Sequence, residues 1–235
     1  MEVEIWSDIM CPFCYIGKRK FENALSQFTD KEDIKVIWKS YQLSPNHVTD
    51  LTLNNYQYLA NHKGISIEEA KQMSDYVADR AVEVGLKYDF DKVILANSFK
   101  AHCLSHLAKR LGLQNEIEEV LFRAYFTEGK NIDDNATLMQ LGIEIGLDEN
   151  EISNVLENGI YGDEVRKDIY EAQQVGVRGV PFFVFDRKYA VSGAQESATF
   201  LKTIEKSYSE WRIENPKAKL EVLEGEVCDI DGNCS

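Results

Sequence analysis

The chain has 235 residues, and its 26 Lys and Arg against 40 Asp and Glu give a formal net charge of −14. So acidic a surface repels phosphate backbones and anionic lipid headgroups, which argues against nucleic acid and membranes as partners. Hydrophobic residues make up 44% of the chain, and there are only 14 Gly and 4 Pro, a composition that excludes disordered and fibrous proteins. The length is sufficient for one large domain or two modest ones.

The amino terminus carries acidic residues where a secretory signal peptide needs positive charge and an apolar run. The longest uncharged stretch, residues 51–62, is too short and too rich in Asn, Gln and Tyr to span a bilayer. We therefore expect a cytoplasmic protein, in a compartment that keeps thiols reduced. Five cysteines are too few for a disulfide scaffold, and close pairs in such a compartment indicate redox chemistry or a metal site.

The first 45 residues predict a β-α-β unit. Residues 3–9 alternate as a short buried strand, and an amphipathic helical pattern runs from the CPFC sequence to Phe28. Residues 34–43 are rich in β-branched and aromatic side chains and end at Ser-Pro, which is typical of a second strand.

Residues 46–162 carry helical periodicity and no strand pattern. A capping box at Ser66-Ile67-Glu68-Glu69 opens a helix that runs to about residue 85. Further helices are predicted over residues 97–111, 115–127, 135–145, 149–156 and 163–174. A hairpin over residues 182–191 and a helix over 197–213 follow. This order predicts an α/β protein in which a helical domain (46–162) interrupts a first domain (1–45 and 163–215), followed by an acidic tail (216–235).

Cys11 and Cys14 lie where the first helix begins, and Pro12 occupies a first-turn position that needs no amide hydrogen. Because the helix dipole and the free amides stabilise an anion there, we expect a lowered pKa for the Cys11 thiol. Cys14, one turn deeper, can attack a mixed disulfide on Cys11 and release the product. The alternatives are a pair of inert buried thiols or a zinc site, for which the sequence supplies no second C-x-x-C or close Cys/His group.

A second signal is Pro181, which stands at the entrance of the predicted hairpin, after Val177-Arg178-Gly179-Val180. Proline cannot donate to a sheet ladder, so it belongs at a strand entrance, and a tight X-Pro turn there is compatible with a cis bond. Alone, a trans proline that starts a strand is the simpler interpretation. Together with the C-x-x-C motif, the position favours a cis bond that faces Cys11.

Four segments together resemble FrnE-type members of the DsbA family of thiol–disulfide oxidoreductases. They are WSDIMCPFCYIGKRKFE (6–22), NSFKAHCLSHLAK (97–109), LFRAYFTEGKNI (121–132) and GVRGVPFFVFDRKYAVSGAQ (176–195). The resemblance covers residues 1–210 and implies a thioredoxin fold interrupted by a helical domain. It also implies that Cys11 is the nucleophile, Cys14 the resolving thiol and Val180-Pro181 the cis-proline loop.

The chain differs from its relatives between the two cysteines. The founding DsbA is periplasmic and has a His there, whereas this chain has Pro12-Phe13, which we include among the candidate substrate-binding residues. Phe13 supplies neither charge nor a hydrogen-bond donor to a Cys11 thiolate, so the strong oxidising power of the founding member does not carry over to this chain by resemblance. Relatives that isomerise hydroxychromene carboxylates, or that transfer glutathione in the kappa class, usually carry Ser at the position of Cys11. Cys at this position therefore favours disulfide exchange.

Other candidate residues have two interpretations each. Cys228 and Cys234 in the tail are expected to form a secondary redox pair, either as a relay that exchanges with Cys11 and Cys14 or as a clip that closes the tail. For His102 and Cys103 we favour helix packing over a place in the active-site cleft. For Trp6 and Tyr15 we favour the core over an exposed, substrate-binding position.

The sequence thus predicts a dithiol–disulfide oxidoreductase without bound metal or cofactor. Its partners would be thiols and disulfides of proteins or small molecules, with glutathione as one candidate. One alternative is a glutathione-dependent isomerase or transferase that acts on an aromatic or polyketide-like molecule. Another is a holdase that binds exposed apolar segments. Neither the direction of electron flow nor the oligomeric state follows from the sequence.

Overall fold

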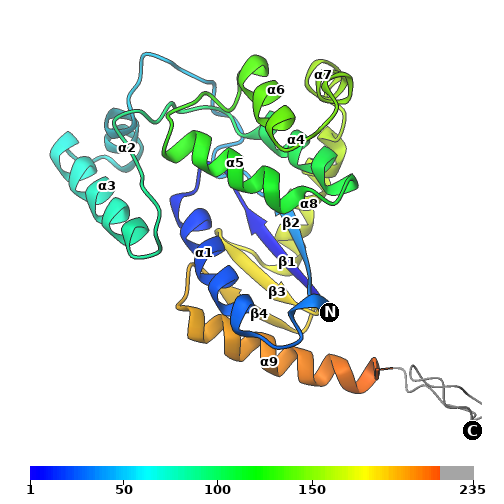
Figure 1. Ribbon diagram of the computed structural model, residues 1–235. Coiled ribbons are helices and arrows are strands. Elements are labelled where there is room, and N and C mark those ends of the chain that lie inside the picture. The colour runs from blue at the N-terminus through cyan, green and yellow to red at the C-terminus, as the bar shows by residue number, and fades with distance from the viewer. Residues whose placement is uncertain (218–235) are drawn as a thin grey trace, which may run out of the picture.

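A computed structural model describes residues 1–217 and contains one four-stranded sheet with the order β2-β1-β3-β4 (Figure 1). The strands are β1 (Glu2–Ser7), β2 (Lys35–Ser40), β3 (Phe182–Phe185) and β4 (Tyr189–Ser192). β1 runs parallel to β2 and antiparallel to β3, which pairs antiparallel with β4. This pairing confirms both the predicted first unit and the hairpin.

One face of the sheet is covered by α1 (Pro12–Gln27) and α9 (Ser197–Glu214), which pack against each other. The alternation of β3 turns Phe183 to this face, where its ring lies 5.5 Å from the ring of Phe21 and 4.5 Å from that of Phe200. All three rings are essentially inaccessible to solvent. Close aromatic packing of this kind fixes α1 on the sheet.

The opposite face of the sheet buries a smaller cluster. Trp6 and Val184 point there and meet Ala172 of α8 (Gly162–Val175). The indole nitrogen of Trp6 is fully buried and donates to the backbone oxygen of Asp168, 3.0 Å away. The predicted core position of Trp6 is confirmed, because a buried indole N–H requires a partner of this kind.

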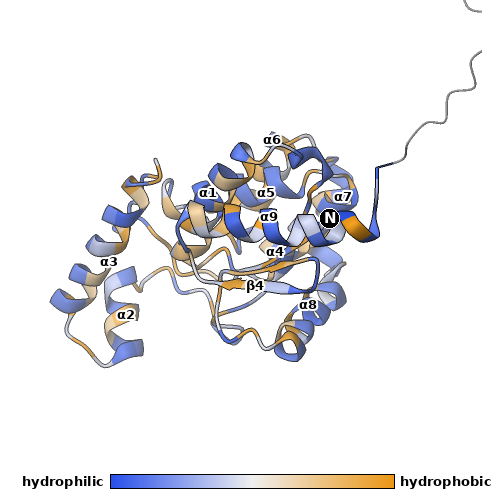
Figure 2. Ribbon diagram, turned by 90° about the horizontal axis from the view of Figure 1, so that it is seen from below, coloured by the Kyte–Doolittle hydropathy of each residue, from blue (hydrophilic) through white to orange (hydrophobic). Residues whose placement is uncertain are grey.

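The helices between β2 and β3 form two groups. They are α2 (Asn55–Lys63), α3 (Ile67–Val82), α4 (Phe99–Arg110), α5 (Gln114–Phe126), α6 (Asn135–Glu144), α7 (Glu149–Asn158) and α8. Helices α4 to α8 pack around the β2 side of the sheet, whereas α2 and α3 form a hairpin that stands apart (Figures 1 and 2). No helix within residues 1–217 is both long and apolar enough to cross a membrane.

Most helices lie within a few residues of their predicted bounds, but α2 was not predicted. Its segment lacks an apolar period, and only Ala60 of its nine residues is buried. Two local devices form it instead: a capping box between Asn54 and Gln57, and Gly64, whose φ of 67° ends it in the left-handed region. The predicted capping box at Ser66 and Glu69 opens α3.

Candidate active site

The two cysteines of the CPFC motif lie where β1 passes into α1. Cys11 is the N-cap residue and Pro12 the first helical residue, as the sequence predicted. The amide of Cys11 donates to the backbone oxygen of Asp8 at 2.9 Å, and the amide of Cys14 donates to that of Cys11 at 3.0 Å. Both thiols are free. Cys11 is 4% exposed and Cys14 is fully buried.

The position of Cys14 makes its thiol hard to ionise. Burial raises its pKa well above the usual range, and its hydrogen bond with Cys11 raises it further. The Ser7 hydroxyl acts in the opposite direction but is a smaller effect. This hydroxyl is buried at the end of β1 and has no hydrogen-bond partner among the described residues.

The loop before β3 comes within reach of Cys11. The Val180–Pro181 bond is cis, as expected from the sequence, and the Cys11 thiol lies 3.5 Å from the backbone oxygen of Val180. Gly17 of α1 permits this approach. A Cβ atom at position 17 would lie 3.0 Å from Cγ of Pro181 and 3.4 Å from the ring of Phe183, so a larger residue would require the loop or α1 to shift.

A buried carboxylate holds the loop before Cys11 in place. Asp8 has no exposed surface, and its two oxygens accept the amides of Met10 at 3.2 Å and of Leu43 at 2.7 Å. Nε2 of His102, on α4, lies 3.5 Å from the same carboxylate. Burial lowers the pKa of His102, but Asp8 and Glu118 together raise it, so the net direction is upward. Asp8 thereby ties the dithiol loop to the segment that follows β2 and to α4.

Tyr88, which lies between α3 and α4, contacts the CPFC motif directly. Its hydroxyl donates to the backbone oxygen of Pro12 at 2.7 Å. Its ring lies 4.6 Å from that of Phe126 and 6.2 Å from that of Tyr15, which confirms Tyr15 as a core residue. Burial raises the pKa of Tyr88, and the neighbouring Cys11 raises it further, so the hydroxyl remains a donor.

Cys11 opens onto a cavity of about 480 Å³ that is bounded by α2, α3, α5, the loop before α4 and the cis-proline loop. Pro12, Phe13 and Val180 line it with Cys11, whereas Cys14 and Pro181 lie behind its surface. Most of its walls are apolar, and the volume is within the range of small-molecule sites. The arrangement places one thiol at the cavity surface and the second behind it, a geometry that would permit stepwise thiol–disulfide exchange.

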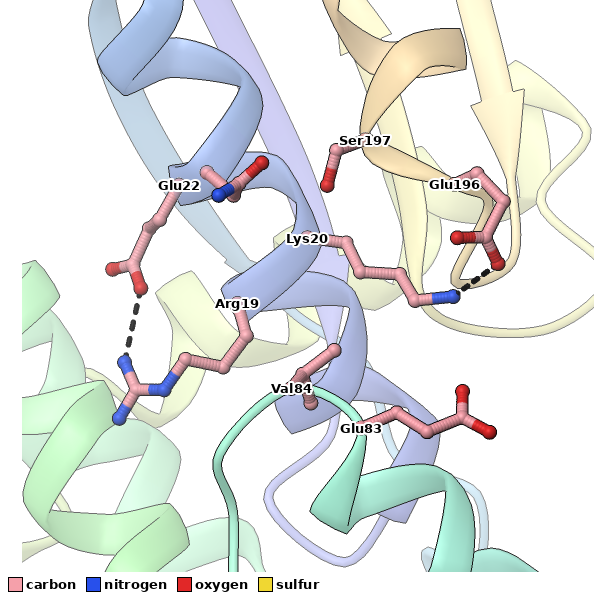
Figure 3. A pocket seen from close by; sticks show the side chains of 8 residues that line it. Arg19, Lys20, Glu22, Glu83, Val84, Glu196 and Ser197 are labelled. Atoms are coloured by element: carbon pink, nitrogen blue, oxygen red, sulfur yellow. Dashed lines mark hydrogen bonds and ion pairs between the residues drawn. The ribbon is translucent and has the colours of Figure 1, made fainter.

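A larger cavity, of about 590 Å³, lies between the middle of α1, the end of α3 and the start of α9 (Figure 3). Its charged side chains are already paired: Lys20 lies 2.5 Å from Glu196, and Arg19 lies 3.0 Å from Glu22. None of its lining residues, all within the described part of the chain, is a cysteine or another strong nucleophile. The smaller, apolar cavity is therefore the better candidate for chemistry.

The remaining sequence candidates divide between core and tail. His102 and Cys103 are each 2% exposed on α4 and do not line the Cys11 cavity, so the expected packing role is confirmed. Burial raises the pKa of Cys103 to about 11, which leaves it protonated. Cys228 and Cys234 lie outside the described residues, and their pairing stays a prediction.

Sequence analysis missed three contributors to the site. The role of Asp8 and the contact from Tyr88 depend on segments that are distant in sequence, and no local pattern indicated either. The cavity wall formed by α2 had a detectable signal in the Asn54–Gln57 capping box, which is followed seven residues later by Gly64.

Comparisons with known proteins agree with this arrangement. Residues 2–205 match the family model of the DSBA-like thioredoxin domain. The uncharacterized protein YwbO of Bacillus subtilis (strain 168) is 26% identical over 211 residues, which cover 87% of this chain and 96% of that protein.

Among solved structures, the probable DsbA oxidoreductase SCO1869 from Streptomyces coelicolor is 35% identical, with a TM-score of 0.83 over 100% of this chain and 98% of that one. The cytosolic disulfide reductase DsbM from Pseudomonas aeruginosa shares the fold at 16% identity, with a TM-score of 0.55 over 93% of this chain and 100% of that one. The fold is also that of 2-hydroxychromene-2-carboxylate isomerase, at 16% identity and a TM-score of 0.61 over the same shares. The chain is a member of the DsbA-like thioredoxin domain family, the oxidoreductase family that its sequence resembles.

Proposed function

We propose that the protein is a dithiol–disulfide oxidoreductase in which Cys11 exchanges disulfides with a substrate in the apolar cavity. The observation that carries the proposal is the asymmetry of the pair: Cys11 lines the cavity at a helix start, whereas Cys14 is fully buried with a raised pKa. A nucleophile must reach its target, and a resolving thiol must reach only the mixed disulfide.

The exchange takes place in two displacements. The Cys11 thiolate attacks one sulfur of a substrate disulfide, which forms a mixed disulfide and releases one substrate thiolate. Cys14 then loses its proton and attacks the sulfur of Cys11, which releases the second substrate thiol and leaves a Cys11–Cys14 disulfide. The substrate is reduced and the dithiol is oxidised by the same two electrons, and the reverse sequence oxidises a substrate dithiol.

The side chains around the motif assist this cycle. The backbone oxygen of Val180, beside Cys11, offers a hydrogen-bond acceptor to a substrate held in the cavity. The Ser7 hydroxyl is available to donate to Cys14 as that sulfur gains charge during the second displacement, which would offset part of the cost of ionising a buried thiol. Thiols of proteins and of small molecules, glutathione among them, are the proposed partners.

Insulin reduction with dithiothreitol or glutathione tests the proposal. Wild type and Cys103→Ala should turn over insulin, Cys11→Ser should not, and Cys14→Ser should stop at a mixed disulfide that mass spectrometry detects. Cys103 is a matched control because it is buried on α4, away from the cavity. Full turnover by Cys11→Ser would refute the mechanism, and unchanged suppression of aggregation without turnover would favour a holdase.

A further inference from the structure

The cavity beside Cys11 differs in charge from the rest of the molecule. The chain has 40 Asp and Glu among 235 residues, yet none of the cavity-lining residues within the described part of the chain is acidic. Its walls include large apolar side chains such as Leu59, Met73, Phe90 and Phe126. An apolar molecule therefore gains from burial here without bringing a carboxylate of the protein into a dry environment.

The charged residue among those that line the cavity is Lys63, in the last turn of α2. It is exposed and makes no ion pair within residues 1–217, unlike Lys20 or Lys39, whose ammonium groups contact carboxylates. His62 beside it lies with its ring 5.7 Å from that of Tyr58 and nearly parallel to it. The rim therefore offers an unpaired cation and an aromatic surface at the edge of an apolar cavity.

We propose that the cavity selects small disulfides that combine an aromatic body with a carboxylate, the body lying against the apolar walls and the carboxylate at Lys63. This inference rests on the proposed disulfide exchange and adds its substrate class. A ring in the cavity finds Phe90 and Phe126 as neighbours, and a volume of about 480 Å³ holds one such molecule. The chain as a whole carries a net charge of −14, so a carboxylate gains most where an unpaired cation such as Lys63 lies beside the cavity.

The reaction is the balanced exchange described above, with an aryl disulfide as the electron acceptor. Cys11 displaces one aryl thiolate, and Cys14 displaces the second and gives up its proton to solvent. Aryl thiolates are weakly basic and leave readily, so binding rather than departure of the leaving group should distinguish one aryl disulfide from another.

The test measures the rate constants at which the reduced protein is oxidised by three disulfides at low ionic strength. Dithiobis(nitrobenzoate) is aromatic and anionic, dithiodipyridine is aromatic and neutral, and bis(2-hydroxyethyl) disulfide is neither. Lys63→Gln should slow the reaction with dithiobis(nitrobenzoate) by about threefold, which is typical of one exposed charge pair, and should leave the other two rates unchanged. Lys71→Gln, an equal charge change at an exposed position of α3 outside the cavity, should change none.

A second variant tests whether the apolar wall of the cavity favours aromatic disulfides, independently of the charge of Lys63. Met73→Gln places a polar group in the cavity wall and should slow both aromatic disulfides relative to bis(2-hydroxyethyl) disulfide. Equal effects of Lys63→Gln and Lys71→Gln, or equal effects of Met73→Gln on all three reagents, would overturn the substrate class. If Cys11→Ser still abolished exchange in that case, the proposed function would stand, whereas exchange without Cys11 would refute the function itself.

Discussion

Two helix pairs of the insertion, α4–α5 and the α2–α3 hairpin, differ in how they are attached to the rest of the protein. Helix α4 buries every residue from Ala101 to Ala108, and α5 buries nine of its thirteen residues. Helices α2 and α3 together bury only Ala60, Ala70, Ser74 and Ala81.

Polar contacts follow the same division. On α5, Glu119 accepts hydrogen bonds from Tyr15 at 2.5 Å and from Lys18 at 2.8 Å, and it also pairs with Arg19, so that α5 is joined to the dithiol helix. The hairpin relies on its capping boxes and on exposed pairs such as Arg80 with Glu83. The α5 side of the cavity is therefore part of the frame that positions Cys11, whereas the hairpin can vary in sequence with little effect on that frame.

The largest expected difference comes from truncating one apolar side chain in each pair. Phe122 of α5 is fully buried with its ring 5.0 Å from that of Tyr15, so Phe122→Ala should lower the free energy of unfolding by about 3–5 kcal/mol. Met73 of α3 is 42% exposed, and Met73→Ala should cost less than about 1 kcal/mol. Urea unfolding of both variants measures the difference, and similar losses would contradict the comparison.

Removal of one carboxylate from each pair should give the next largest effect. Glu119→Gln leaves the ammonium of Lys18, whose side chain is 2% exposed, with Glu22 as its remaining carboxylate. Because a buried charge loses a partner, we expect a loss of about 2–3 kcal/mol in the free energy of unfolding. Glu83→Gln, which breaks an exposed pair at the end of α3, should cost less than about 0.5 kcal/mol. Equal shifts of the thermal midpoint in the two variants would show that polar contacts do not distinguish α5 from the α2–α3 hairpin.

Acid should destabilise the contacts of α8 with β2 and α4, which depend on Asp168. The carboxylate of Asp168, on α8, accepts hydrogen bonds from Lys39 at 2.8 Å, from the Ser40 amide at 3.1 Å and from His106 at 3.2 Å. Burial alone would raise its pKa, but these bonds have the larger combined effect and lower the pKa to about 2. A lowered pKa contributes stability above the unfolded value near 4, and this contribution, about 2 kcal/mol, is lost as pH falls toward 2. Asp168→Asn should therefore reduce the difference in unfolding free energy between pH 7 and pH 3. Asp163→Asn, at an exposed position of the same helix, serves as the matched control.

The smallest effect is expected at Tyr88, which lies between α3 and α4 and contacts the CPFC motif. Tyr88→Phe removes the bond to the Pro12 backbone oxygen and should cost about 1 kcal/mol of stability. Because that oxygen belongs to the CPFC motif, the alkylation rate of Cys11 should also change, by up to roughly fivefold. Tyr76→Phe on α3, where the ring is 61% exposed, should change neither quantity. If the alkylation rate of Cys11 is unaltered in Tyr88→Phe, then Tyr88 contributes to packing and does not influence the reactivity of Cys11.

The division also explains what the sequence could predict. Helix α4 and the strands follow from apolar periodicity because they are buried, whereas α2 has almost no buried face and depends on its caps. Cys11 and Cys14 follow from a local motif. The approach of Val180, 169 residues away from Cys11, was expected only because two motifs occurred together in a recognisable order. Tyr88 and Asp8 act through tertiary contacts, which periodicity and spacing do not encode.

Gly17 controls the spacing between α1 and the cis-proline loop. It has no chemistry of its own, yet its missing side chain sets how closely the dithiol helix approaches Pro181, with Cγ only 3.0 Å from where a Cβ would lie. A single methyl group at position 17 would push α1 and Pro181 apart. Because Cys11 begins the same helix and Val180 precedes the same proline, it would also change the distance between Cys11 and Val180. The spacing between Cys11 and the cis-proline loop thus depends on Gly17, a residue that does not line the cavity.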